Sequence, residues 1–140
     1  MRQLYAYWLS VHPAGGGLPG RQHVDPAALP SLLPNIWLVD VQREPLRFRY
    51  RLFGTAQVTV VGSDLTGQWL DEAHPTFLTS VAYAQFVAAV ERGEPGYRSG
   101  HPFIIVPKDY LMMERLILPL ARDGTTVDML LAISVYHKKR

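Results

Sequence analysis

The sequence of 140 residues contains no cysteine. This absence excludes disulfide bonds, zinc sites built on thiolates, iron–sulfur clusters and cysteine nucleophiles. Charged residues are also few, at 19% against 48% hydrophobic residues, so the chain is not a disordered polyelectrolyte. No apolar run reaches the ~20 residues of a membrane-spanning helix, and the first residues lack a signal-peptide pattern. We expect one domain, of the usual size of about 150 residues, located in the cytoplasm.

The formal net charge of +2 comes from the end of the chain. Three of the 14 basic residues are Lys138, Lys139 and Arg140, and the other 11 face 12 acidic residues. Proteins that bind nucleic acid carry a broad basic surface on the folded body. We therefore expect no specific nucleic-acid partner.

The first third of the chain predicts a helical segment followed by two strands, over residues 36–42 and 46–53. Apolar residues near the start recur at helical spacing: Leu4, Tyr7, Trp8 and Val11. The second strand alternates basic and apolar residues: Arg47, Phe48, Arg49, Tyr50, Arg51 and Leu52. Three guanidinium groups are costly to bury, so we expect their face to be solvated, with an anionic partner as the alternative.

One long helix is predicted over residues 76–92, ended by Gly93 and Pro95. Its apolar residues form two neighbouring stripes, so we expect it to be covered on more than one side. Gln85 projects near this surface and needs a hydrogen-bond partner if it is buried.

Three strands are predicted after this helix, over residues 97–106, 111–120 and 127–137. Asp123 and Gly124 are typical of a hairpin turn between the last two strands. Both of these strands are apolar on two faces, whereas a sheet covered on one face alternates polar and apolar residues. The second face is therefore covered by the N-terminal helix, by a partner subunit, or by both.

The order of these elements, together with several short motifs, resembles the PAS domain. The motifs are Gly-Thr at residues 54–55, Leu-Thr-Gly at 65–67, and the segments 114–120 and 127–131. More narrowly, the chain resembles a bacterial family of stand-alone PAS proteins found mainly in alphaproteobacteria. The resemblance implies an α+β fold with a five-stranded antiparallel sheet in the order 2-1-5-4-3. Helices would cover one face, after an N-terminal helical extension.

The resemblance also implies an extension over residues 1–35 and a PAS core over 36–140, acting as a single domain. Such domains hold a small ligand between sheet and helices, or a packed core where the ligand has been lost. We expect a sensory or regulatory binding module that forms a homodimer. Because one domain uses all the residues, its output would pass to a separate signalling protein. The expected dimer contacts are Leu4, Tyr7, Trp8 and Val11.

Candidate ligand contacts are aromatic, methionine and polar residues expected between the sheet and the helices. They are Tyr50, Trp69, Phe77, Gln85, His101, Phe103, Met113, Arg115 and Met129. The alternative for the apolar ones is that they are plain core residues. Arg115 interrupts an apolar strand face, and its alternative role is a salt bridge with a strand neighbour.

The identity of any cofactor stays open. Relatives with a covalently reacting flavin or another chromophore carry a reactive cysteine, which this chain lacks. Haem-binding relatives place a histidine on the long helix, whereas His74 precedes that helix beside Pro75, so we do not expect haem.

Asp71, Glu72 and His74 are the acidic and histidine residues that stand closest together. Acid–base catalysis by such a group needs a desolvated cleft, and the segment is predicted to be exposed. We therefore expect no catalytic residues and no metal site. Two alternatives remain open: a small α+β enzyme of the nuclear-transport-factor-like type, and an interaction domain without a ligand.

Overall fold

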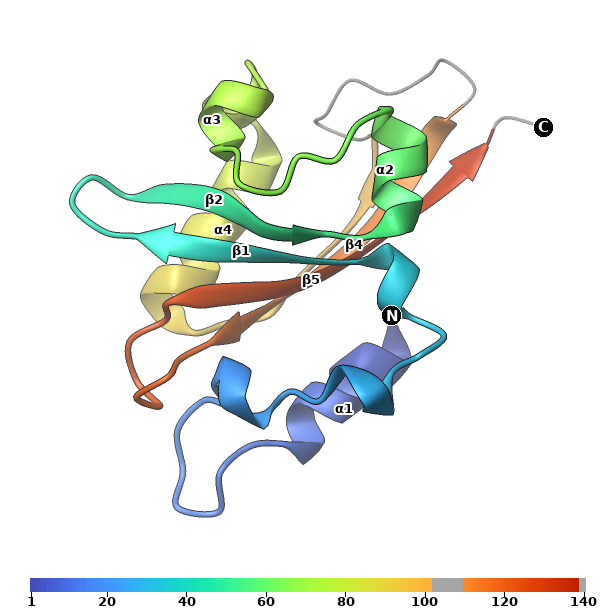
Figure 1. Cartoon of the computed structure of the whole chain (residues 1–140). Helices are drawn as coiled ribbons and strands as arrows, with labels where there is room; N and C mark the ends of the chain where they lie inside the picture. Colours follow the sequence, from blue (N-terminus) through green and yellow to red (C-terminus); the bar gives the residue numbers. More distant parts are fainter. Residues whose placement is uncertain (102–109, 139–140) are drawn as a thin grey trace.

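Five strands form one antiparallel sheet in the computed structural model, which describes residues 1–101 and 110–138 (Figure 1). The strands are β1 (Ile36–Gln42), β2 (Arg47–Phe53), β3 (Gly96–Gly100), β4 (Tyr110–Leu120) and β5 (Met129–Lys138). Their order across the sheet is β2-β1-β5-β4-β3, which confirms the predicted topology. Of the strand predicted over residues 97–106, the part from residue 102 onward lies outside the described residues.

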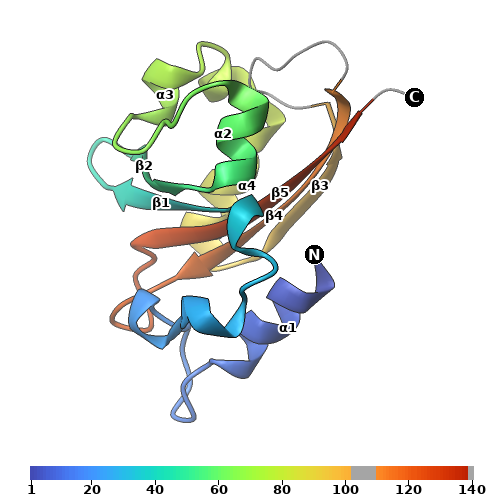
Figure 2. The same cartoon turned by 45° about the vertical axis from the view of Figure 1, so that its right-hand side comes forward.

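Helices lie on both sides of this sheet, as Figures 1 and 2 show. α2 (Thr55–Val61), α3 (Leu70–Ala73) and α4 (Val81–Arg92) lie on the side that we call the inner face. The outer face carries α1 (Arg2–Ser10) and the turns that follow it. A nuclear-transport-factor-like fold, with its helices ahead of the sheet, does not fit, because β1 and β2 precede α4. Among the helices of the described residues, none has the length and hydrophobicity to cross a membrane.

The inner core is built from aromatic rings. Phe86 on α4 is fully buried, and its ring centroid lies 5.1 Å from that of Phe48, 5.2 Å from Phe77 and 5.9 Å from Trp37. Aromatic pairs at such distances, mostly edge to face, add to the stabilisation that burial provides. These contacts hold α4 against β1 and β2.

The outer face is covered by the chain's own N-terminal extension. Leu4 and Trp8, one turn apart on α1, are buried, and the indole Nε1 of Trp8 donates a hydrogen bond to the Pro119 carbonyl at 3.0 Å. The sheet residues packed beneath them include Leu116, Leu118, Leu120, Leu131 and Ile133. Cover by the N-terminal extension thus explains the two apolar faces of β4 and β5.

α4 begins at Val81 rather than at residue 76. Ser80 caps it, because its Oγ accepts a hydrogen bond from the backbone N–H of Tyr83 at 3.2 Å. Leu78 and Val81 are 56% and 55% exposed. The buried residues of the helix form a single stripe: Ala82, Phe86, Ala89 and Val90. The prediction that this helix is covered on more than one side is therefore wrong.

A β-bulge interrupts the pairing of β1 with β2. Leu38 pairs with Leu52, but the next residue, Val39, pairs with Tyr50, so Arg51 is the extra residue. A bulge disrupts the regular alternation of side chains between the two faces. Arg51 and Leu52 are both exposed as a result. The prediction that Leu52 shares the buried face of Tyr50 is wrong for this reason.

Candidate functional site

A polar pair is buried between the sheet and the inner-face helices. The hydroxyl of Tyr50 on β2 lies 2.7 Å from Nε2 of His74, which follows α3. His74 is only 4% exposed, and this burial lowers its pKa to about 4, so the ring is neutral at pH 7. Burial also raises the pKa of the Tyr50 phenol. The predicted exposure of residues 71–74 holds for Glu72 but is wrong for His74.

Arg115 is a charged residue buried in the same gap. It lies on β4, is 1% exposed, and donates from Nη2 to Oε1 of Gln85 at 2.6 Å. Gln85 on α4 donates from its amide to the Tyr97 carbonyl at 2.9 Å. The strand residues directly opposite Arg115 are Arg98 and Ser134. Neither is acidic, and the alternative of a salt bridge with a strand neighbour stays a prediction.

The Arg115 guanidinium remains charged at neutral pH. Burial, followed by the positive charge of Arg98, lowers its pKa to about 10. The nearby phenols of Tyr136 and Tyr50 act in the opposite direction. The gap between sheet and helices therefore contains a permanent positive charge.

A small cavity lies beside Arg115. Its volume is about 10 Å³, enough for about one water molecule. On one side, the indole Nε1 of Trp37 donates to Oγ of Ser134 at 2.9 Å, and the amide of Gln57 donates to the Ser134 carbonyl at 3.1 Å. The remaining lining residues are Tyr50, Phe53, Met113 and Tyr136. The cavity is thus walled by aromatic rings and by hydrogen-bond donors that already have partners.

Several predicted ligand contacts meet at this cavity. Tyr50, Met113 and Arg115 line it, and Gln85 reaches it through its hydrogen bond with Arg115. Phe77 lies in the aromatic core instead, with its ring centroid 5.2 Å from that of Phe86. The structure therefore brings four of the nine predicted residues together.

Trp69 lies outside the gap. The segment 67–69 runs antiparallel beside β2, where the Tyr50 amide donates to the Gln68 carbonyl at 2.9 Å. The indole ring of Trp69 stacks against Arg47, whose guanidinium carbon lies 4.1 Å from the ring centroid. Trp69 therefore helps to close the edge of the sheet, and its prediction as a pocket residue is wrong.

Two further predicted contacts also lie away from the cavity. His101 follows β3 and is exposed. Met129 packs with the outer core, because its neighbour Leu130 faces the inner core and successive strand residues face opposite sides. Phe103 lies outside the described residues.

Five residues of the cavity wall were not among the predicted contacts: Trp37, Phe53, Gln57, Ser134 and Tyr136. Two of them carry a signal that could have been read. Ser134 interrupts an apolar strand, and Gln57 is a buried amide on a short helix of mostly apolar and β-branched residues. A single polar residue on an apolar face needs a buried partner, and such residues tend to gather.

The gap is rich in hydrogen-bond donors. Indole, amide and guanidinium groups line it, each with a partner in the chain, so a bound anion or carbonyl oxygen would have to replace one of these partners. Within residues 1–101 and 110–138, no three histidine, aspartate or glutamate side chains gather as a metal site requires.

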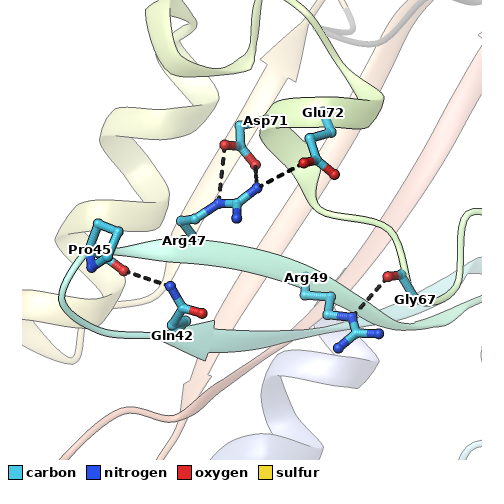
Figure 3. Close-up of polar contacts among 7 residues, drawn as sticks. All are labelled: Gln42, Pro45, Arg47, Arg49, Gly67, Asp71 and Glu72. Atoms are coloured by element: carbon cyan, nitrogen blue, oxygen red, sulfur yellow. Dashed lines mark hydrogen bonds and ion pairs between the residues drawn. The ribbon is translucent and has the colours of Figure 1, made fainter.

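Arg47, the first arginine of β2, joins that strand to α3 (Figure 3). Its Nε and Nη2 donate to the two carboxylate oxygens of Asp71 at 3.2 and 3.0 Å, and Nη2 lies 3.5 Å from Glu72. Arg47 thus pairs with carboxylates of its own chain rather than with a separate anionic partner.

Arg49 and Arg51 fit the predicted solvated face. Arg49 is exposed and donates from Nε to the Gly67 carbonyl at 2.8 Å (Figure 3). The side chain of Arg51 is 68% exposed, and Nη1 lies 3.8 Å from the Asp40 carboxylate. Arg51 is therefore only loosely paired.

The predicted dimer contacts divide into two pairs. Leu4 and Trp8 are buried on the chain's own sheet, so they are unavailable to another copy and their prediction is corrected. Tyr7 and Val11 are half-buried. The large apolar side chains that α1 leaves exposed are Tyr5 at 40% and Leu9 at 49%.

The chain is similar to a solved structure and matches a family model. Its structure is similar to the crystal structure of the sensory box sensor histidine kinase from Vibrio cholerae, with a TM-score of 0.56 and 13% identity over 81% of this chain and 90% of that chain. At this identity the likeness shows the fold alone. None of the curated proteins matches the sequence. A family model described as PAS domain matches residues 1–134, so the chain belongs to the PAS domain family.

Proposed function

We propose that this PAS domain is a sensory and regulatory binding module that recognises a small anion between its sheet and α4. The observation that carries the proposal is that Arg98 and Arg115 lie directly opposite each other on β3 and β4. Like charges in this position of an antiparallel sheet destabilise it. An anion between the two guanidinium groups would replace their repulsion with charge-assisted hydrogen bonds.

Gln85 is the residue that such an anion would displace. Its Oε1 accepts the 2.6 Å hydrogen bond from Arg115, and its amide holds the Tyr97 carbonyl. The cavity beside Arg115 has room for about one water molecule. A phosphate or carboxylate must therefore move Gln85, and with it α4. Binding would shift the domain between two positions of α4, because the anion has a higher affinity for one of them.

An interaction domain without a ligand is the second candidate. The cavity of about 10 Å³ favours it, since a packed core leaves no room for a guest. In that case the hydrogen bond between Arg115 and Gln85 serves only to hold α4 on the sheet, and partner proteins bind at the surface of the domain.

The proposed output is the same for both candidates. The domain acts in the cytoplasm as a homodimer and passes its signal to a separate signalling protein. The exposed Tyr5 and Leu9 of α1 support a contact between copies, because Leu4 and Trp8 on the other side of this helix are already covered.

Native mass spectrometry of the protein purified from its own host tests the proposal. We expect a retained small anion that is lost in Arg115→Met but kept in Arg92→Met, a matched variant of an arginine that is 68% exposed. Two results together would contradict the proposal: no retained molecule, and no rise of the melting temperature with phosphate or with a panel of organic acids. The chain would then be an interaction domain without a ligand.

A further inference from the structure

Two neighbouring hollows lie on the outer face near β2. One is a cleft of about 450 Å³ with a charged lining, and the other is an apolar slot of about 70 Å³. Arg21 lines both hollows. Arg51 of the cleft is followed in the chain by Leu52 of the slot. The cleft and the slot are therefore adjacent, and together we call them the outer groove.

The slot is formed by the N-terminal extension packed against β1 and β2. Its apolar lining includes Val24, Leu29, Leu33, Ile36, Leu38 and Leu52. Leu33 and Leu52 at its rim are 39% and 44% exposed. The bulge at Arg51 is what turns Leu52 toward this face, and bulges commonly re-aim a side chain in this way. The slot is suited to the end of one aliphatic side chain.

The cleft brings together charged groups from separate parts of the chain: Arg21, Asp40, Arg51, Arg122 and Asp128. Three guanidinium groups against two carboxylates give the cleft a positive balance. The pair of Arg51 with Asp40, at 3.8 Å and largely exposed, is weak and can exchange partners. Arg21 is oriented by a hydrogen bond from Nη1 to the Val24 carbonyl at 2.8 Å, which leaves its other donors for a carboxylate.

The composition of the outer groove favours a protein partner over a small molecule. Small-molecule sites are mainly apolar and enclose their ligand, whereas this cleft is lined by exposed charged residues. Protein interfaces combine arginine with an apolar anchor inside a polar rim. This combination is present here, with Arg21 and Arg51 at the border of the slot.

We infer that the outer groove binds a segment of a partner protein with one aliphatic residue flanked by aspartate or glutamate. The aliphatic side chain enters the slot, and the carboxylates pair with Arg21 and Arg51. Asp40 and Asp128 would repel further carboxylates, so a uniformly acidic segment is disfavoured. This site goes beyond the proposed anion site, which lies at Arg115 in the inner-face gap.

Selection of peptides from a random display library against the chain of 140 residues tests this inference. The enriched peptides are expected to share an aliphatic residue beside aspartate or glutamate. Once synthesised with a fluorescent label, they should bind Leu52→Asp and Arg51→Glu at least about tenfold more weakly than the wild type in anisotropy titrations.

The chain offers matched controls for both substitutions. Arg92 has the same 68% side-chain exposure as Arg51 and the same 3.8 Å distance to a carboxylate, and Leu78 is 56% exposed. Arg92→Glu and Leu78→Asp should leave peptide affinity within about twofold of the wild type. Arg115→Met should also bind normally, so failure of the anion proposal would not affect this result.

Three outcomes would overturn the inference. The first is a library that yields no acidic–aliphatic consensus, and the second is equal affinity of the peptides for the wild type and Leu52→Asp. The third is a homodimer that Leu52→Asp converts to a monomer in sedimentation experiments, since the groove would then belong to a second copy of the chain.

Discussion

The hydroxyl of Tyr50 and the imidazole of His74 are hydrogen-bonded inside the inner core, at 2.7 Å. The turn after α3 is thereby attached to β2. Because burial lowers the pKa of His74 to about 4 from the ordinary 6.5, the unfolded chain takes up a proton at higher pH than the folded one. The stability of the fold is therefore linked to pH through one buried ring.

The contribution of His74 to stability should be fully present above about pH 6.5 and be lost as the pH falls toward 4, by up to about 3 kcal/mol. Urea denaturation of the wild type and of His74→Gln at pH 7 and at pH 4.5 measures it. The substitution should flatten the pH dependence, whereas His101→Gln, at an exposed histidine, should follow the wild type. Parallel profiles for the wild type and His74→Gln would contradict the assignment.

Phe86→Ala should lower the free energy of unfolding by about 3–5 kcal/mol, because it removes the ring that packs on Trp37, Phe48 and Phe77. Chemical denaturation measures the change. Leu78→Ala, at a residue 56% exposed, is the control and should stay within about 0.5 kcal/mol of the wild type. A similar loss in both variants would mean that α4 does not lie on the sheet as described.

Trp8→Ala tests whether α1 covers its own sheet. It removes a buried indole and its hydrogen bond to Pro119, so we expect a loss of about 3–5 kcal/mol. The loss should not depend on protein concentration, because the contact lies within one chain. Two results would instead place Trp8 between subunits. One is a loss of stability that grows on dilution, and the other is a wild-type dimer that Trp8→Ala converts to a stable monomer.

Arg115→Met should change the stability of the ligand-free protein by less than about 1.5 kcal/mol, because two opposing effects largely cancel. Removing the buried charge ends the cost of its desolvation, whereas Oε1 of Gln85 loses the donor that Arg115 supplies. Ile117→Met, at a fully buried residue of the same strand, is the matched control and should cost less than about 1.5 kcal/mol. A larger loss in Arg115→Met than in the control would show that the guanidinium stabilises the fold rather than serving binding.

The parts of the fold set by strand alternation were predictable from the sequence. Tyr50 precedes the bulge of β2, and Met113 and Arg115 follow the register shift of β4, so their positions in the alternating pattern fix which face they share. The apolar pattern of β4 and β5 likewise predicts cover on both faces. The strand order came from the resemblance to the PAS domain, because local patterns do not determine which strands pair.

The errors fall where the chain leaves regular structure. Trp69 and His101 follow turns or strand ends, so their direction depends on contacts distant in sequence. The bulge at Arg51 shifts the alternation of side chains along β2, and the cap at Ser80 shifts the start of α4. Neither shift changes the residue types from which the strand and the helix were predicted. The burial of His74 depends on Tyr50, which is far from it in the chain. The acidic residues next to His74 instead led to the prediction that it is exposed.

Residues 67–69, paired along β2, also determine how the sheet can grow. The Tyr50 amide and carbonyl bond to Gln68 and Gly67 at 2.9 and 2.7 Å, so a strand from another molecule finds these groups occupied. The opposite border, β3, is a short strand that carries Arg98, and short charged borders resist strand addition. Among the described residues, β3 is therefore the border at which strand addition would begin, and a charge-neutral residue in place of Arg98 would weaken its resistance.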